Sequence, residues 1–249
     1  RHRGRPVDGD DAPYLSAATI HEAVRVMSVL YRLAMDEDPP LVTSNPFSRL
    51  DMPRIEPRQI QFYEHEEAER LYKALEEHFG LQWRTLVELG MHVGLWPGEI
   101  YGLHAHRVDW TRGRVHVVEG MTRYGLRQYP KTKRSHRSVP VPPRTLASMS
   151  RLMEGRDAWA DCTCPRVLPD GTRQAGRPCP SLLFPAPGGG PIDDGNFRDR
   201  VWYPAIEAAG IRRLPPRVMR HTAASWLVMD GVPLYHVQHL LGHERSTTT

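Results

Sequence analysis

Helical patterns that end at a glycine dominate the sequence and limit the folds open to it. Apolar residues recur every three or four positions in the segments 64–79, 86–93, 196–209, 218–229 and 234–241. This is the spacing of helices with one buried face. Glycine, which is common just past the end of a helix, follows such segments at Gly94, Gly210, Gly231 and Gly242. Two segments, 114–118 and 138–141, have the extended, valine-containing character of strands. The patterns predict a mixed α/β protein, mainly helical, with a small β-sheet.

The first sixty residues have a different organisation. Ser16 can cap a helix whose apolar positions run from Ile20 to Ala34. The residues from Met52 to Arg58 are charged, interrupted by prolines and without period, as interdomain linkers tend to be. We therefore predict part of an upstream helical domain at 1–52, a linker at 53–60 and the main domain at 61–249. The start at Arg1 and the end in a polar turn are expected of a piece of a longer protein.

Composition excludes several classes of protein. Hydrophobic residues make up 40% and charged residues 25% of the chain, which is ordinary for a soluble globular protein. No apolar run is long enough to span a bilayer, and no basic-then-apolar leader opens the chain. The sequence alone therefore predicts a cytoplasmic protein without a membrane partner.

Basic residues are concentrated in one part of the sequence. The formal net charge is only +4, but nine basic residues and two acidic ones lie between Arg107 and Arg137. Such a surface suits phosphate groups. Taken alone, it could equally be an ordinary solvated surface.

The three cysteines all lie in an aperiodic segment, about 155–180, that is predicted to be an inserted loop. Cys162, Cys164 and Cys179 are three possible zinc ligands, but a structural zinc site takes four and the sequence shows no obvious fourth. We therefore predict loose thiols, with no metal and no cofactor, and keep a zinc clip as the alternative. An odd number of cysteines also disfavours a secreted disulfide framework.

Four short motifs occur in a fixed order along the main domain. They are GLWPGEI at 94–100, PKTK at 130–133 with Arg137, RVMRHTAA at 217–224 and VQHLLGH at 237–243. Each is weak alone, but the order and the gaps between them are specific. Over most of residues 60–249 they resemble the catalytic domain of the tyrosine site-specific recombinases, the phage integrase family. The resemblance implies that family's fold, with a small antiparallel sheet, and the end of a helical core-binding domain upstream.

The resemblance also implies a metal-free reaction on double-stranded DNA. In the family a tyrosine attacks a phosphodiester and forms a 3′-phosphotyrosyl link, for DNA integration and site-specific recombination. Arg220 matches a catalytic arginine, whose planar fork suits the charge of the transition state. Lys131 matches the general acid, and His243 matches a histidine that binds a non-bridging oxygen. The implied DNA contacts are Lys133, Arg134, Arg137 and His221.

Two catalytic positions depart from the family pattern. Trp96 stands where the first catalytic arginine is usual, and Arg217 stands at the usual position of a histidine. Indole offers one neutral N–H donor in place of a charged fork, and arginine cannot serve as a base near neutral pH. The nucleophilic tyrosine would come at a position beyond Thr249. We therefore expect strand cleavage to be much slower than in the family. A basic side chain from elsewhere could replace the missing arginine, and the candidates are His92, His104, Arg107 and Arg123.

A second interpretation follows from these departures. The chain could be a non-catalytic DNA-binding protein derived from a degenerate integrase, in which Lys131, Arg220 and the basic hairpin that the resemblance implies around Lys131 hold phosphates without cleavage. For the enzyme, the resemblance implies a homotetramer on two DNA sites in the full-length protein. The amino-acid sequence does not indicate which DNA sequence the protein would recognise.

Overall fold

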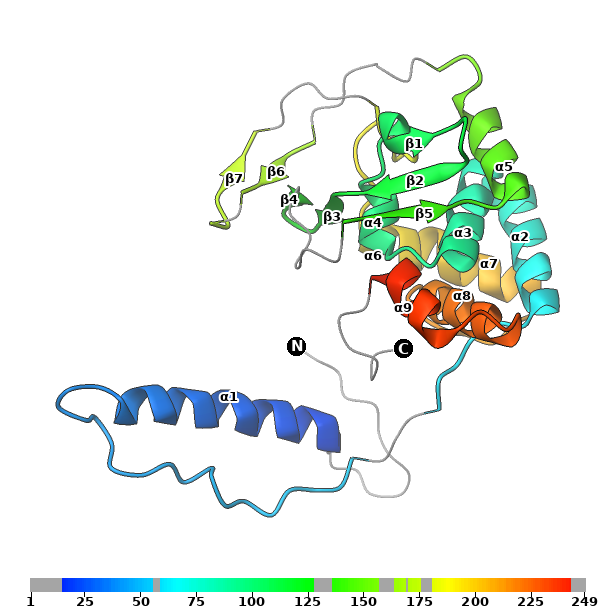
Figure 1. The fold of residues 1–249 in the computed structure, drawn as a ribbon. Coiled ribbons are helices and arrows are strands. Elements are labelled where there is room, and N and C mark those ends of the chain that lie inside the picture. Colours follow the sequence, from blue (N-terminus) through cyan, green and yellow to red (C-terminus); the bar gives the residue numbers. More distant parts are fainter. Residues whose placement is uncertain are drawn as a thin grey trace. The chain divides into compact units, whose positions relative to one another are not determined.

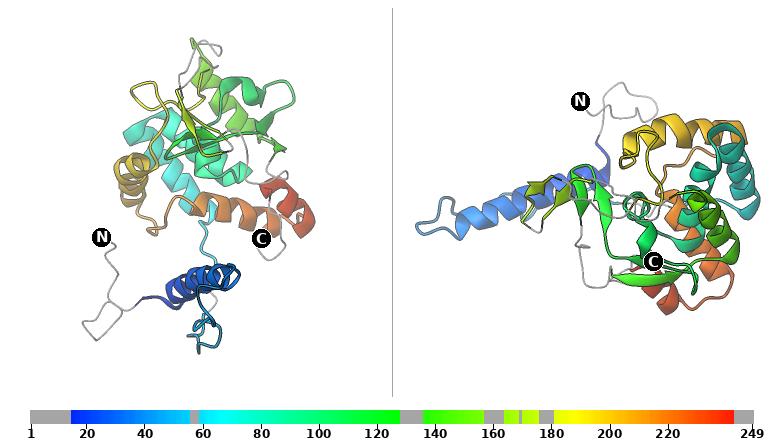
Figure 2. Two further views of the ribbon diagram at one scale, coloured as in Figure 1. Left: turned by 90° about the vertical axis from the view of Figure 1, so that its left-hand side faces the viewer. Right: turned by 90° about the horizontal axis from the view of Figure 1, so that it is seen from above.

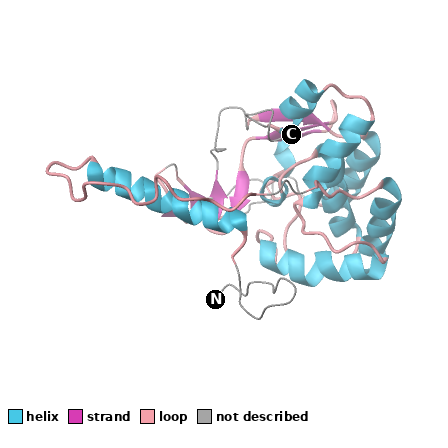
Figure 3. Cartoon of the chain, turned by 90° about the horizontal axis from the view of Figure 1, so that it is seen from below, coloured by secondary structure: helices cyan, strands magenta, loops and turns pink. Residues whose placement is uncertain are grey.

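The contacts within the chain divide it into two units, Arg1–Gln59 and Ile60–Thr249. The computed structural model describes residues 15–55, 59–127, 136–156, 164–168, 170–175 and 181–242. Helices are the main element of the described chain (Figure 3). The predicted mixed α/β class, mainly helical, is confirmed. Within the described residues, no helix is long and apolar enough to cross a membrane.

The first unit contains one helix, α1 (Ala17–Met35), which Ser16 caps as predicted by accepting a hydrogen bond from the Thr19 N–H at 3.2 Å. Asn45 Nδ2 donates to the Ser28 hydroxyl at 2.9 Å and holds the following loop along the helix. No residue of α1 is buried. Its apolar side is therefore covered only in part by the described residues of its own unit.

The core of the second unit surrounds α3 (Leu81–Val93), which packs against α2 (His65–Phe79), α5 (Pro143–Met153) and α8 (Val218–Met229). Leu86, Val87 and Leu89 are fully buried on it. Gly90 allows α8 to approach, because a Cβ there would lie 2.8 Å from Met219 Sδ. The short helix α4 (Pro97–Tyr101) and the 3-10 turn η1 (Ala105–Arg107) follow α3 in the chain.

The C-terminal part of the unit is helical, as predicted. A helical run begins at α6 (Asp194–Phe197), passes through a π turn, η3 (Arg198–Trp202), and continues as α7 (Tyr203–Ala209). The helices α8 and α9 (Leu234–Leu241) have the predicted bounds. The buried Trp202 donates its indole N–H to the Leu214 carbonyl at 2.8 Å, which ties this run to the segment before α8.

A small antiparallel sheet lies beside these helices (Figure 1). Its strand order is β1 (Val108–Asp109), β2 (Arg114–Val117), β5 (Arg137–Pro140), and both pairings are antiparallel. Val115 and Val139 pair across β2 and β5 and are buried in the same core as α3. The predicted strands and their antiparallel arrangement are confirmed.

A second sheet departs from the prediction of an irregular insertion. Its order is β3 (Gly120–Thr122), β4 (Gly125–Arg127), β6 (Arg166–Val167), β7 (Arg173–Gln174). The last two strands belong to the inserted segment, so its interpretation as a loop without strands is wrong. β6 pairs in parallel with the edge of β4, and the Leu126 N–H donates to the Pro165 carbonyl. Two-residue strands are too short to show a periodicity in the sequence.

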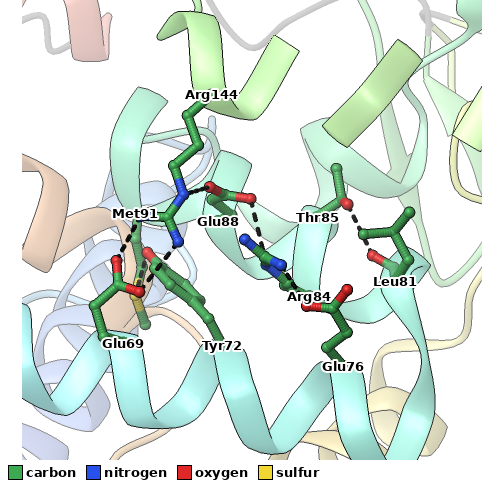
Figure 4. A network of polar contacts seen from close by, with 9 residues as sticks. All are labelled: Glu69, Tyr72, Glu76, Leu81, Arg84, Thr85, Glu88, Met91 and Arg144. Atoms are coloured by element: carbon green, nitrogen blue, oxygen red, sulfur yellow. Dashed lines mark hydrogen bonds and ion pairs between the residues drawn. The ribbon is translucent and has the colours of Figure 1, made fainter. Parts of the chain in front are cut away.

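A buried carboxylate links three helices of the core (Figure 4). Glu88 on α3 is fully buried, and its Oε1 lies 3.3 Å from Arg144 Nε of α5. Arg84 Nε lies 3.9 Å from the other oxygen, and Glu69 of α2 accepts from Arg144 Nη1 at 2.8 Å. Burial raises the pKa of Glu88 above that of an ordinary glutamate, although Arg84 and Arg144 oppose the shift.

We expect Glu88→Gln to raise the melting temperature more at about pH 8 than at about pH 5. A glutamate whose pKa is raised by folding binds its proton more tightly in the folded state, so its stabilising contribution is lost as the pH rises through the folded-state pKa. Glutamine has no proton to lose. The melting temperatures of both proteins at the two pH values test this.

Glu69→Gln is the matched control, since Glu69 also contacts Arg144 but its pKa is lowered, chiefly by the hydrogen bond from Arg144. Its stabilising contribution is present above the unfolded-state pKa, which is about 4.3 for a glutamate, and is lost only as the pH falls below that value. Glu69→Gln should therefore change the melting temperature by nearly the same amount at the two pH values. The same trend in both variants would contradict the assignment of the buried charge to Glu88.

Candidate active site

Arg220 lies where three of the four motifs meet. It comes from α8 and is only 3% exposed. Its Nη1 donates to the Gly94 carbonyl at 2.7 Å, and its Nη2 donates to the Leu241 carbonyl at the end of α9. Figure 2 shows α8 in orange beside α9 in red. The sequence prediction singled out Arg220, and the structure places it between the segments of the first and last motifs.

Gly94 is required at this meeting point for two reasons. It ends α3 with a φ of 72°, in the left-handed region that favours glycine. A Cβ at this position would also lie 2.3 Å from Leu241 Cδ2 and 3.2 Å from Ala223 Cβ. The glycine therefore lets α3, α8 and α9 approach closely enough for Arg220 to reach both carbonyls.

Trp96 covers the guanidinium of Arg220. The carbon at the centre of the guanidinium lies 4.6 Å from the centroid of the Trp96 ring, a cation–π contact. Trp96 is 45% exposed, so the tryptophan is not a core residue. The Arg220 Nε is buried and has no hydrogen-bond partner among the described residues. An aromatic ring therefore lies over the guanidinium of Arg220, at the position where the sequence resemblance leads us to expect a first arginine.

Burial lowers the pKa of Arg220 to about 10, and the nearby charge of Arg137 contributes to the shift. The charge of Glu99 acts in the opposite direction. Even at this value the guanidinium stays protonated at neutral pH. The site therefore keeps one permanent positive charge in a largely desolvated position, where a charge interacts more strongly with an anion than it does in water.

Arg137 has its main described partners inside the protein. Its Nη1 and Nη2 donate to the two carboxylate oxygens of Glu99 at 2.9 and 2.8 Å, and its Nε donates to the Leu240 carbonyl at 2.8 Å. The side chain is 4% exposed. These bonds hold β5 against α4 and α9. The predicted DNA contact of Arg137 stays a prediction.

Glu99 was not predicted as a site residue. Besides binding Arg137, its Oε2 accepts from the Trp96 N–H at 2.9 Å and so caps α4. A glutamate three residues after the start of a helix is a recognisable capping signal. Its second partner could not be inferred, because Arg137 lies 38 residues further along the chain.

Arg217 and His221 lie at the N-terminal end of α8. Arg217 is the capping residue, and both side chains are exposed. The pKa of His221 is lowered by partial burial and by the charges of Arg217 and Arg220. Positive charges gathered at a helix N-terminus repel one another and attract an anion. This end of α8 is thus the exposed cationic part of the site.

An apolar cavity of about 390 Å³ adjoins these residues. Its lining includes Trp96, Arg220 and His221, together with Val228, Met229 and Leu241. The cavity leads to the covered guanidinium.

Several predicted site residues lie outside the described part of the chain. These are Lys131, Lys133, Arg134 and His243, together with Cys162 and Cys179. Their predicted roles stay predictions. The described strands on either side of the basic segment, β4 and β5, end at Arg127 and begin at Arg137.

The basic residues considered as substitutes for the missing arginine have other partners. His104 Nδ1 lies 2.8 Å from Glu119 Oε1, and Arg107 Nε lies 3.7 Å from the same oxygen. Arg123 stacks on Tyr124, with 4.4 Å between its guanidinium carbon and the ring centroid. His92 lies beside the ring of Trp226, and burial lowers its pKa. These contacts do not support the predicted route around Trp96.

We expect Glu99→Gln to lower the free energy of unfolding by about 3 to 5 kcal/mol. The substitution removes a carboxylate from a buried guanidinium and weakens the cap of α4. Asp199→Asn, which breaks the exposed pair with Arg198, should cause a much smaller loss, because solvent screens an exposed ion pair. Urea unfolding of the three proteins measures both losses. Equal small losses would show that the Glu99–Arg137 pair does not stabilise the site.

The family comparison covers the whole second unit. The model of the phage integrase family matches residues 61–249. The tyrosine recombinase XerC-like protein of Caldanaerobacter subterraneus is 27% identical over 203 residues, which cover 77% of this chain and 49% of that protein. The tyrosine recombinase XerC of Bacillus licheniformis is 26% identical, over 94% of this chain and 69% of that protein. The chain thus spans about half the length of the first relative.

Solved structures share the fold. The Tn1549 transposon integrase in complex with transposon right end DNA has a TM-score of 0.74 and 19% identity, over 94% of this chain and 74% of that one. A lambda integrase tetramer bound to a Holliday junction has a TM-score of 0.63 and 17% identity, over 94% of this chain and 60% of that one. With Arg220 at the meeting point of three motifs, these findings show that the chain belongs to the phage integrase family and carries its tyrosine recombinase catalytic domain.

Proposed function

We propose that the protein containing this chain breaks and rejoins DNA at specific sites through a 3′-phosphotyrosyl intermediate. The observation that carries the proposal is the buried guanidinium of Arg220, held by carbonyls of the first and last motifs. A cation fixed in advance stabilises the extra charge of a phosphorane without reorganising during the reaction. In this proposal Arg220 binds a non-bridging oxygen of the scissile phosphate.

The remaining predicted site residues have proposed roles in the same reaction. Lys131 protonates the leaving 5′ oxygen, and His243 donates to a non-bridging oxygen. Arg217 binds phosphate at the N-terminus of α8, where His221 adds a second donor. Lys133 and Arg134 contact the DNA backbone. Arg217 cannot accept a proton near neutral pH, so its role is limited to binding.

Trp96 supports a second candidate function, a DNA-binding protein without strand cleavage. The ring lies over the guanidinium of Arg220, and it supplies no second guanidinium. Arg217, Arg220 and the basic segment can hold DNA without a nucleophile. Covalent attachment to DNA distinguishes the two functions.

The proposal also covers the partner, the assembly and the location of the protein. The partner is double-stranded DNA, and the full-length protein acts as a homotetramer on two sites in the cytoplasm. The DNA-bound integrase neighbours support the DNA partner, and one of them, a tetramer on a Holliday junction, supports the assembly. The cytoplasmic location is proposed from the sequence alone.

The direct test is a cleavage assay on a form of the protein extended past Thr249 by a tyrosine-bearing segment. The substrate is a nicked duplex carrying a site recovered by binding to a library of DNA fragments, so that cleavage traps a covalent complex. We expect Trp96→Arg to raise the cleavage rate by about 10²- to 10³-fold, because it restores a preorganised charged donor.

Trp96→Phe is the matched control, since it changes the ring but adds no charge, and it should give no such increase. If the unchanged protein cleaves as fast as Trp96→Arg, the missing guanidinium does not limit catalysis. If neither forms a covalent complex while both bind the site, the non-catalytic function is favoured.

DNA binding is tested through its salt dependence. We expect Arg217→Ala to weaken binding to all duplexes and to reduce the slope of log K against log salt by about 1, because one phosphate contact is lost. Arg70→Ala, on the glutamate-rich α2, should leave the slope unchanged. Fluorescence anisotropy at several salt concentrations measures both. An unchanged slope for Arg217→Ala would remove Arg217 from the interface.

A further inference from the structure

A tight hairpin in the second sheet exposes an arginine and a tyrosine. β3 and β4 pair with Thr122 opposite Gly125, so Arg123 and Tyr124 form a loop of two residues between them. The Thr122 hydroxyl donates to the Gly125 carbonyl at 2.8 Å and accepts from the Tyr124 N–H at 3.2 Å. Tyr124 is 46% exposed. Its ring is therefore held at the surface and adds little to the core.

Two arginines from separate segments stack on the ring of Tyr124. The guanidinium carbon of Arg123 lies 4.4 Å from the ring centroid, and that of Arg173, on β7, lies 5.6 Å from it. Arg173 Nε also donates to the Tyr124 carbonyl at 3.1 Å. Stacking uses the flat face of a guanidinium and leaves N–H groups at its edge for an acceptor. The tyrosine thus holds two cations in place before any anion binds.

Gly125 lets the inserted segment close on this hairpin. Its φ is 131°, in the region that favours glycine, and a Cβ there would lie 2.4 Å from the Pro165 carbonyl oxygen. The backbone of the insertion therefore approaches β4 closely enough for Arg173 to reach Tyr124.

The second sheet has one buried face and one face with arginines. Leu126 of β4 packs with Cys164 and Leu182 in a small buried core. Neighbouring residues of a strand point to opposite faces, so Arg127 lies on the other side. Arg127 and Arg173 are in one row across β4, β6 and β7, and both are exposed. The insertion thus adds an arginine to the exposed face of the hairpin.

Two carboxylates share a cavity of about 370 Å³ with the stacked arginines. Asp193 accepts from the Asn196 N–H at 2.7 Å and caps α6, and Asp194 accepts from the Tyr101 hydroxyl at 3.2 Å. Neither carboxylate forms an ion pair within the described part of the chain. They would repel an anion from the interior of the cavity. An anion can therefore contact only the exposed edges of the arginines.

Close packing fixes the second sheet to the helix that starts after Trp96. A Cβ on Gly98 would lie 2.5 Å from the Met121 carbonyl oxygen, and one on Gly102 would lie 2.9 Å from the Met121 nitrogen. α4 thus packs directly on β3, and its capping residue Trp96 covers Arg220. The sheet is therefore held in a fixed place relative to the buried guanidinium. Figure 1 shows β6 and β7 extending beyond β3 and β4, away from the helices.

We propose that Arg123, Arg127 and Arg173, with Tyr124 as their platform, form a second contact surface for the phosphate backbone of duplex DNA, outside the reaction site. The inference rests on the proposed DNA binding of this domain and extends it to the inserted segment. No described carboxylate pairs with these arginines, and guanidinium groups bind phosphate oxygens through paired N–H donors. Backbone contacts fix the orientation of a protein on a duplex without reading its sequence. The insertion would therefore align the duplex with Arg220.

The test is the salt dependence of binding to a fluorescently labelled duplex of mixed sequence, measured by anisotropy with the whole chain. We expect Arg173→Ala to reduce the steepness of log K against log salt by about 1, and the double variant Arg123→Ala with Arg173→Ala to reduce it by about 2. Each lost phosphate contact leaves one more counterion on the DNA. Arg151→Ala is the matched control, because it removes an exposed arginine of α5, and it should leave the steepness unchanged.

The platform is tested by two variants of Tyr124. Tyr124→Ala should weaken binding at low salt, because the arginines lose the ring that holds them. Tyr124→Phe keeps the ring and should bind as the unchanged protein does. Equal affinities of the two variants would remove Tyr124 from the surface.

Arg217→Ala separates a failure of this inference from a failure of the proposed function. A reduced steepness for Arg217→Ala, with no change in the double variant, overturns the second surface and leaves the reaction site as the DNA contact. A chain that does not bind the duplex overturns both. An effect of Arg151→Ala as large as that of Arg173→Ala also overturns the surface, since any exposed arginine would then serve. Arg173→Gln, which keeps a polar side chain, should show the same loss and guards against an alanine variant that fails to fold.

Discussion

The burial of one guanidinium organises the second unit. Arg220 cannot leave water at low cost unless its donors are satisfied, and two carbonyls from distant segments satisfy two of them. Those carbonyls are available only because α3 ends at Gly94 and α9 ends at Leu241 beside α8. The helix ends at glycine allow the three helices to approach closely, and this approach in turn lets Arg220 keep its charge in a buried position.

Much of the fold could be predicted because its helices are amphipathic and end at glycines. The bounds of α8 and α9 agree with the sequence patterns, as does the antiparallel pairing of β2 and β5. The helix α5 was missed although Leu146, Met149, Leu152 and Met153 recur at helical spacing and pack on the core, because prolines surround its start. The strands β6 and β7 were missed because they exist only through pairing with an edge supplied elsewhere in the chain.

The candidate site could be located from sequence, but its internal bonds could not. Arg220 and Trp96 were identified from motifs, yet the contact of ring and guanidinium is a result of packing. Arg137 belongs to a basic segment that suggested an outward-facing residue, whereas its guanidinium binds Glu99 and Leu240. The pattern of charges in a sequence shows where basic residues are concentrated. It does not show which of them pair with a carboxylate in the folded protein.

Glu99 carries a further consequence for how such domains can be altered. One carboxylate both starts α4 and receives the arginine of β5, so the first motif and this strand are matched to each other. A β5 strand from a relative would fit this chain only if it brought an arginine at the place of Arg137. Exchange of this strand is therefore constrained by a residue that does not belong to the exchanged part.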